Sequence, residues 1–226
     1  MRLSLLSLLL LLASVGLRAE ERRERVLFET TMGPIVVELY NETPHHRDNF
    51  LHLVSEHVYD SLLFHRVVAN FMIQAGDPDS RRAERGAHLG EGTLGYTLAP
   101  EFRTGQGLYH RRGALCAARE GDDVNPGRES DASQFYIVWG VRHSEERLEK
   151  ARAYVEQMIG RPYAFSPGQT EDYLWTGGTP TLDEQYTVFG QVVEGLETVE
   201  DIQAQPRDEN DRPVEDIRIL RAVIVP

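Results

Sequence analysis

Arg66 and Gln74 are the polar side chains whose placement in this sequence most suggests chemistry. Both lie in the stretch FHRVVANFMIQAGDP (64–78), which otherwise reads as two short apolar strands. If side chains alternate along the first strand, Phe64, Arg66 and Val68 share one face. The pattern thus places a guanidinium, which is always charged, beside bulky apolar neighbours and raises the question of its role.

Motifs for other reactive centres are missing. The eight histidines form no HExxH pair, and the single cysteine, Cys116, excludes a CxxC pair and an internal disulfide. Cys116 lies in an apolar strand, where a thiol is typically a small core residue. No GxSxG, GxxxxGK[ST] or helix-opening GxGxxG occurs, and the acidic stretch GDDVNPGRESD lacks the spacing of a calcium loop. We therefore expect no metal and no cofactor.

The elements that must position Arg66 and Gln74 are mostly strands. The sequence predicts a hairpin over 25–40, a helix after Thr43 with Pro44 in its first turn, and a later helix over 195–204. Further strands are expected over 62–74, 113–118, 133–140, 185–193 and 217–225. Because closure removes exposed sheet edges, these strands favour a mainly β fold, a closed antiparallel barrel capped by two helices.

One block departs from this pattern. Ser144 can cap a helix that runs to about Gly160, and a second small helix is predicted near 170–175. We interpret residues from about 142 to 178 as a helical insertion in the barrel.

The first residues resemble an export signal. Arg2 precedes an apolar run from Leu3 to Leu12, and small residues lead to Ala19. We predict that residues 1–19 are cleaved and that 20–226 form one domain. A membrane anchor is the alternative, but the run is shorter than the ~20 residues of a spanning helix. The sequence thus predicts export, with the periplasm as destination and secretion as the alternative.

The net charge is strongly negative. The formal charge of −12 becomes −14 when residues 1–19, with two arginines, are removed. Such a surface repels phosphate backbones and argues against nucleic acid as a partner.

At this point the residues resemble a known family. The pattern Phe-His-Arg, four residues, Phe-Met-x-Gln-x-Gly-Asp is similar to the signature of the cyclophilin family of peptidyl-prolyl cis-trans isomerases. The stretches GYTLAPEF, GALCAAR, SQFYIV and LDEQYTVFGQVVEG follow in the family's order, so the similarity spans roughly residues 25 to 225 and is closer to bacterial exported members. It implies an eight-stranded antiparallel barrel capped by two helices and isomerisation of X-Pro bonds.

The resemblance also implies roles for individual residues. Arg66 would donate a hydrogen bond to the prolyl nitrogen of a twisted bond, and Gln74 would bind the carbonyl of the preceding residue. The substrate-binding residues implied are Phe64, Phe71, Met72, Ala118, Arg119, Gln134, Tyr136, Leu182 and Tyr186, with Ala118 and Arg119 acting through their backbone. No metal ligand is implied.

Three positions depart from the family's usual residues. Thr181 replaces a Trp at the rim, Tyr186 a His and Arg119 an Asn. The Thr181 departure argues against tight binding of cyclosporin, but Arg66 and the pocket floor are retained.

The expected partners are proline-containing segments of exported proteins, unfolded or folded. We expect a monomer with no stable membrane insertion after the signal is removed. A non-catalytic prolyl-peptide-binding chaperone or scaffold is the alternative, and a barrel carrying a ligand in its interior is a third reading, disfavoured because large apolar residues should fill a small barrel.

Overall fold

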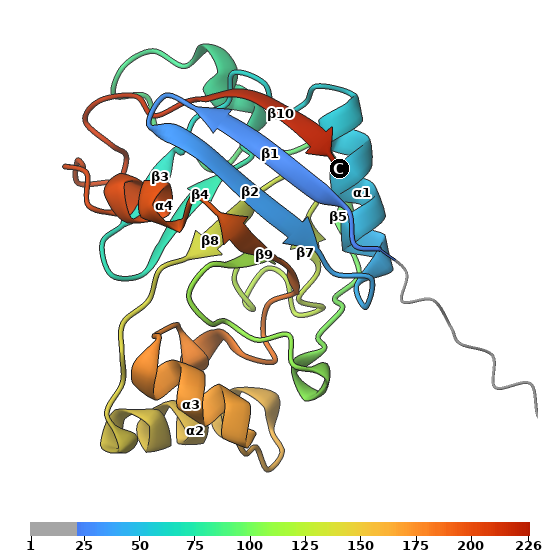
Figure 1. Cartoon of the computed structure of the whole chain (residues 1–226), viewed down its shortest axis with the longest axis vertical. Coiled ribbons are helices and arrows are strands. Elements are labelled where there is room, and N and C mark those ends of the chain that lie inside the picture. Colours follow the sequence, from blue (N-terminus) through green and yellow to red (C-terminus); the bar gives the residue numbers. More distant parts are fainter. Residues whose placement is uncertain (1–21) are drawn as a thin grey trace, which may run out of the picture.

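A computed structural model describes residues 22–226, so the predicted signal at 1–19 lies outside the described residues. The main element is an antiparallel sheet of eight strands in the order β10-β1-β2-β9-β6-β8-β4-β3 (Figure 1). Its strands are β1 (Arg25–Thr30), β2 (Gly33–Leu39), β3 (Arg66–Val68), β4 (Met72–Ala75), β6 (Ala114–Ala117), β8 (Phe135–Val138), β9 (Val188–Glu194) and β10 (Ile219–Val225). A separate pair joins β5 (Thr97–Leu98) to β7 (Ser130–Asp131).

The sheet curls into a half-barrel and does not close, so the prediction of a closed barrel is wrong in this respect. The strands β10 and β3 are its two edges and do not pair as a ladder. The strand β3 is only three residues long, and the residues before it pair with the segment that leads into β10 only in an isolated bridge, between Leu63 and Arg218. The Val67 N–H of β3 donates instead to the carbonyl of Asp211 in the loop before β10, at 2.8 Å. That loop covers part of the edge that a longer strand would have paired.

Two of the four α-helices of residues 22–226 cover the curled sheet. The helix α1 (Pro44–Ser55) packs on β9 and β10, and α4 (Leu196–Gln203) packs on β2, β3 and β4. Figure 1 shows them on opposite sides of the sheet. The first begins after Thr43 with Pro44 at its first position, as the sequence predicts.

Aromatic side chains fill the space between the sheet and α1. The rings of Phe28 and Phe135 stack with centroids 5.4 Å apart, and Phe50 and Tyr59 meet Phe135 edge-on. All four side chains are buried. This packing argues against a ligand carried in the interior, because large side chains occupy the inward positions.

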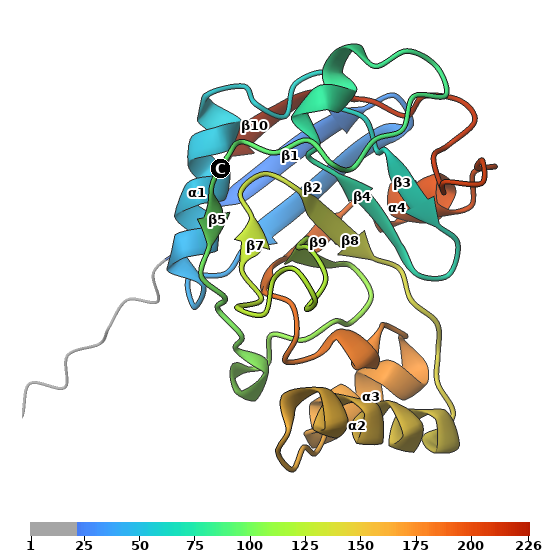
Figure 2. The ribbon, with the colours of Figure 1, turned by 180° about the vertical axis from the view of Figure 1, so that it is seen from behind.

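The other two helices, α2 (Glu145–Ile159) and α3 (Pro167–Trp175), lie between β8 and β9 in the chain. Figures 1 and 2 show them packed side by side at one end of the molecule, apart from the sheet. Ser144 caps α2 by accepting a hydrogen bond from Arg147 N, and Ser166 caps α3 in a capping box with Gln169. The helix α3 begins at Pro167, earlier than the predicted start near residue 170. Ser166 caps the helix, and Pro167 takes its first position.

The chain returns from these helices to the sheet through Gly178. Its backbone bridges to Arg111 and to Val141, and its φ is +157°. A Cβ atom at this position would lie 2.3 Å from the carbonyl oxygen of His110, so only glycine fits without rearrangement. The end of the insertion is therefore held against the segment that leads into β6.

No helix among residues 22–226 is long and apolar enough to cross a membrane.

Candidate active site

Arg66 and Gln74 face each other across the β3–β4 pair. They are register partners, and directly opposite residues of antiparallel strands share one face of the sheet. The Arg66 Nη1 atom donates to Gln74 Oε1 at 3.4 Å, and its Nε lies 3.8 Å from Asp211 Oδ2. The arginine side chain is 44% exposed. Arg66 thus lies at the rim of a pocket rather than in the core, with one neighbour on each side of its guanidinium.

Gln74 is fixed from behind by a second glutamine. Its Nε2 donates to Gln134 Oε1 at 3.1 Å. Gln134 Nε2 in turn donates to the carbonyl oxygens of Gly90 and Gly92, at 3.0 and 2.9 Å. Gln134 is buried, so it acts behind Gln74 and also ties down the loop around Gly90. This chain of amides sets the orientation of the Gln74 side chain.

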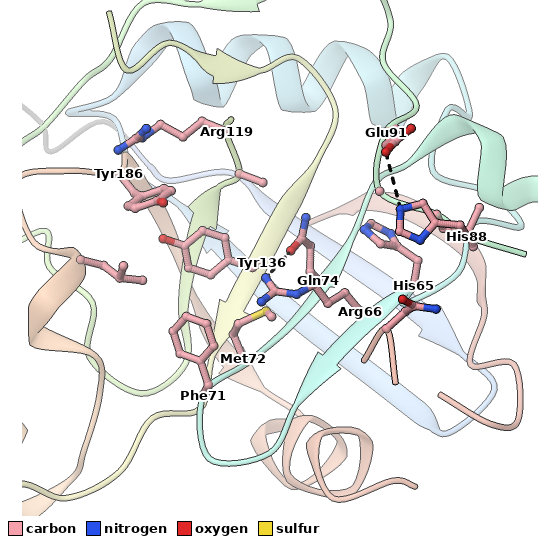
Figure 3. Close-up of a pocket in the computed structure, with 15 residues that line it drawn as sticks. His65, Arg66, Phe71, Met72, Gln74, His88, Glu91, Arg119, Tyr136 and Tyr186 are labelled. Carbon is pink, nitrogen blue, oxygen red and sulfur yellow. Dashed lines mark hydrogen bonds and ion pairs between the residues drawn. The ribbon is translucent and has the colours of Figure 1, made fainter. Parts of the chain in front are cut away.

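A pocket of about 320 Å³ opens beside Arg66. Figure 3 shows its walls converging on one space, with Arg66 and Gln74 on one side and the rings of Tyr136 and Tyr186 on the other. Its apolar walls are Phe71, Met72, Tyr136, Leu182 and Tyr186, which pack in one cluster. The arrangement is a small apolar socket with a guanidinium and an amide at its edge, suited to a compact apolar ring flanked by polar backbone.

Ala118 and Arg119 also line the pocket, and a backbone role for them in substrate binding stays a prediction. The Ala118 N–H donates to Gln134 O, and its carbonyl accepts from Asp131 N, both at 2.9 Å. Arg119 donates from Nε to Gln185 O at 2.9 Å and places its guanidinium 4.4 Å from the centre of the Tyr186 ring. The backbone of Ala118 is therefore engaged within the protein, and the Arg119 side chain supports Tyr186.

Two predicted site residues do not line this pocket: Gln134 lines an adjoining groove, and Phe64 lies in the core. The ring of Phe64 is buried in the core of the half-barrel, and the Phe64 N–H donates to Ile217 O at 2.8 Å. The prediction assumed that side chains alternate from Phe64 to Arg66. Because β3 begins only at Arg66, that alternation does not extend back to Phe64.

Several lining residues were missed by the sequence analysis. They come from the segment beside Arg66, from the loop at 88–91 and from the loop before β10: His65, His88, Leu89, Gly90, Glu91 and Asn210. The loops carry no periodic pattern that could have indicated them. His65 was detectable only as the neighbour of Arg66.

The imidazole of His65 is unusual. It is buried, and neither ring nitrogen has a hydrogen-bond partner. Burial lowers its pKa to about 4, although the nearby Asp77 carboxylate acts in the opposite direction. The folded protein therefore holds His65 neutral at ordinary pH.

A larger groove of about 860 Å³ adjoins the pocket. Both are lined by Gln74, Gly90, Glu91, Ala118 and Arg119, so the two hollows run together. A peptide seated in the pocket has room to extend into this groove.

Among residues 22–226, no group of three or more histidine, cysteine, aspartate or glutamate side chains is placed to hold a metal ion. The single cysteine, Cys116, is buried opposite Tyr136 in the β6–β8 pair, and burial raises the pKa of its thiol well above the usual value.

Comparison with known proteins agrees with this geometry. A family model described as cyclophilin type peptidyl-prolyl cis-trans isomerase/CLD matches residues 25–224. A Staphylococcus haemolyticus protein named as a peptidyl-prolyl cis-trans isomerase is 31% identical over 203 residues, covering 88% of this chain and 90% of that protein. A Caenorhabditis elegans peptidyl-prolyl cis-trans isomerase is 30% identical over 201 residues, which cover 88% of this chain and 38% of the longer worm protein.

Solved structures show the same fold. The crystal structure of a Cryptosporidium parvum cyclophilin type peptidyl-prolyl cis-trans isomerase has a TM-score of 0.63 and 23% sequence identity, covering 90% of this chain and 98% of that one. A second structure of that protein, in the presence of the dipeptide Ala-Pro, has a TM-score of 0.61 at the same identity and covers 89% of this chain and 99% of its own. With a family match over residues 25–224 and a bacterial relative aligned along most of both chains, this chain belongs to the cyclophilin-type peptidyl-prolyl cis-trans isomerases.

Proposed function

We propose that this protein accelerates X-Pro isomerisation through a hydrogen bond from Arg66 to the prolyl nitrogen. The observation that carries the proposal is the position of the Arg66 guanidinium, at the edge of an apolar pocket and opposite Gln74. A proline ring in this pocket would have its nitrogen close to the rim where the guanidinium lies.

The chemistry follows from the electronic structure of the peptide bond. In the planar bond the nitrogen lone pair is delocalised into the carbonyl group, which gives a rotational barrier of ~18–20 kcal/mol. Twisting the bond localises the lone pair on nitrogen, which then accepts a hydrogen bond. A fixed donor at that nitrogen is therefore used in the twisted state and not in either planar state, so it lowers the barrier.

Gln74 is suited to hold the other side of the bond. One of its two amide hydrogens is used by Gln134 Oε1, and its oxygen accepts from Arg66. The second hydrogen can donate to the carbonyl of the residue before proline. Anchoring this carbonyl while the prolyl side turns is the positioning part of the reaction.

The apolar walls serve the same step. Phe71, Met72, Tyr136 and Leu182 surround the space for the proline ring and exclude water from it. A hydrogen bond from Arg66 to nitrogen is stronger in such surroundings than in water. Tyr186, backed by Arg119, would border the ring on the far side.

We also propose that the natural substrates are prolyl segments of exported proteins. This part rests on the sequence of residues 2–19, which has the order of an export signal. The Cryptosporidium relative was solved in the presence of Ala-Pro, which makes short prolyl peptides the natural first probes. Sequencing the N-terminus of the protein purified from its native cells tests the first part: a start near Glu20 supports export, and a retained Met1 contradicts it.

The test of the mechanism is Arg66→Ala. Because the proposed bond forms only in the transition state, we expect kcat for a short X-Pro peptide to fall roughly 100- to 1000-fold with little change in KM. The measurement is the rate of cis-to-trans conversion by residues 20–226. Arg221→Ala is the matched control, since Arg221 is an exposed arginine on a strand, β10, and is not among the pocket residues.

Two outcomes would overturn the proposal. If Arg66→Ala keeps most of the wild-type kcat, the arginine is not the donor. If the wild-type protein binds the peptide without accelerating its conversion, it acts as a prolyl-peptide-binding module. Whatever the kinetic outcome, the free energies of unfolding of Arg66→Ala and Arg221→Ala should lie within about 0.5 kcal/mol of the wild-type value, because both arginines are exposed.

A further inference from the structure

Three side chains of the insertion converge on one buried carboxylate, Asp183, in the segment between the insertion and β9. Asp183 Oδ2 accepts hydrogen bonds from Tyr173 Oη at 2.7 Å, Gln169 Nε2 at 3.0 Å and Tyr163 Oη at 3.3 Å. Asp183 is fully buried and directly follows Leu182, a wall of the pocket. The insertion is thus bonded to the residue next to the pocket wall.

The second oxygen of Asp183 binds a buried histidine. Its Oδ1 accepts from the backbone N of His110 at 3.0 Å and lies 2.9 Å from His110 Nδ1. A carboxylate only accepts hydrogen bonds, so Nδ1 carries the hydrogen. In the neutral ring Nε2 is then an acceptor, and it lies 3.0 Å from Tyr136 Oη. Burial raises the pKa of Tyr136 well above its usual value, so the hydroxyl stays protonated and donates.

Tyr136 connects this series of hydrogen bonds to the pocket. Its ring is one of the apolar walls and lies nearly parallel to the His110 ring, with an interplanar angle of 14° and centroids 6.2 Å apart. Tyr186, another wall, meets both rings edge-on, at 6.4 Å from His110 and 6.0 Å from Tyr136. A shift of His110 would therefore displace two walls of the pocket, since closely packed rings move together.

We propose that Tyr163, Gln169 and Tyr173 of the insertion are positioning residues for the proline pocket, acting through Asp183 and His110 on Tyr136. We call these six residues the Asp183 relay. The inference rests on the proposed function only in taking this pocket as the proline site. The insertion then stabilises the position of the pocket walls. It influences substrate binding although no residue of the insertion contacts the substrate.

The first test is Tyr173→Phe, which removes one hydrogen bond to Asp183 and keeps the ring. Because Tyr136 would contact the proline ring in planar and twisted states alike, its misplacement weakens both, and KM should rise roughly two- to tenfold with kcat unchanged. Tyr109→Phe is the matched control: Tyr109 Oη donates to Asp172 Oδ2 at 2.6 Å in the same aromatic cluster, outside the relay. It should leave KM unchanged.

The second test asks whether the effect travels through the Tyr136 hydroxyl. In a Tyr136→Phe background the hydroxyl link of the relay is already cut, so adding Tyr173→Phe should raise KM less than it does in the wild-type background. An equal rise in both backgrounds would overturn the proposed route. If Tyr173→Phe and the double variant Tyr163→Phe/Tyr173→Phe both keep the wild-type KM, the insertion does not position the pocket.

Binding measured by calorimetry separates this proposal from the arginine mechanism. In an Arg66→Ala background, Tyr173→Phe should still weaken binding of the X-Pro peptide by the same factor, because the relay acts on the walls and not on the donor. Retained kcat in Arg66→Ala would remove the arginine mechanism and leave this result unaffected. Unchanged affinity on adding Tyr173→Phe would remove the relay alone.

Discussion

Two buried histidines of this protein have the same kind of partners and stand in regions with different tasks. His46, in the first turn of α1, lies 2.6 Å through Nδ1 from Glu101 Oε2 and 3.0 Å through Nε2 from Ser130 Oγ. His110 has a carboxylate, Asp183, and a hydroxyl, that of Tyr136, in the same order. Each buried imidazole thus has a carboxylate as hydrogen-bond partner on one ring nitrogen and a hydroxyl group on the other.

The His46 group ends inside the protein. Its connectivity is that of a serine hydrolase triad, but Ser130 is only 2% exposed, and the cavity that His46 lines has a volume of about 10 Å³. That volume barely holds one water molecule, so no substrate reaches the hydroxyl. Glu101 also accepts from the backbone N of His46, at 3.0 Å. This group therefore fastens the start of α1 to the β5–β7 region.

The His110 group ends at the pocket. Its hydroxyl belongs to a side chain that a bound peptide would meet, and its carboxylate is held by the insertion. The hydrogen bonds within the two groups are alike. The comparison therefore teaches that the role of a buried carboxylate, histidine and hydroxyl depends on whether the residue with the hydroxyl faces the core or a pocket. Three experiments can break or sharpen it.

The largest effect is expected from the two carboxylates. Glu101→Gln and Asp183→Asn each replace an oxygen of a buried carboxylate, which accepts several hydrogen bonds, by an NH2 group. Because several buried partners are lost at once, each variant should lower the free energy of unfolding by about 3–5 kcal/mol. Both losses are measurable by urea denaturation. Only Asp183→Asn should also raise KM for an X-Pro peptide. An equal rise in KM for Glu101→Gln would show that both groups influence the pocket and would remove the distinction.

The next largest effect is expected in the pH dependence of the free energy of unfolding, through His65. This residue shows how burial changes the pKa of a histidine that has no hydrogen-bond partner. An unfolded histidine has a pKa near 6.5, and burial lowers that of His65 to about 4. Between these values the unfolded chain binds more protons, so the free energy of unfolding falls as the pH falls from 6.5 to 4. The full loss is about 3 kcal/mol, of which about 2 kcal/mol comes above pH 5.

His65→Asn serves as the control for this series because asparagine does not titrate. Its unfolding free energy should depend less on pH between 6.5 and 5. Glu101 adds a similar dependence at lower pH: burial acts to raise its pKa, but hydrogen bonds from His46 outweigh burial and lower it. The range above pH 5 therefore isolates His65. Identical slopes for wild type and His65→Asn in this range would contradict the prediction.

The smallest effect is expected from the two hydroxyls. Ser130→Ala and Tyr136→Phe each leave a buried histidine nitrogen without its partner, which should cost about 1–3 kcal/mol of unfolding free energy. Ser130→Ala should keep the wild-type KM, whereas Tyr136→Phe should raise it. Denaturation and peptide kinetics on the same two proteins decide the matter, and a raised KM in Ser130→Ala would count against the comparison.

The sequence predicted the features that depend on nearby residues. Arg66 and Gln74 lie on two strands joined by a short turn, so their pairing is set within a dozen residues. Ser144 and Pro44 mark helix starts for equally local reasons. In each case the signal and the structure share one segment of the chain.

The features that were missed depend on distant segments. The sheet stays open beside the short strand β3, and Phe64, just before that strand, lies in the core. The loop that covers the edge of β3 is more than a hundred residues away in the chain. Asp183 reads in the sequence as an ordinary acidic residue of a loop. Its partners come from 110, 163, 169 and 173, and no periodic pattern shows that they meet.

The buried thiol of Cys116 has a practical consequence for work on this protein. As the only cysteine, inaccessible and with its pKa raised by burial, it should react slowly with thiol reagents. A cysteine introduced at an exposed position, such as Tyr154 on α2, can therefore carry a spin label or a dye with little background. Site-directed labelling usually requires removal of native cysteines by mutation, and this protein does not need that step. The distance from α2 to the pocket can therefore be measured with and without bound peptide.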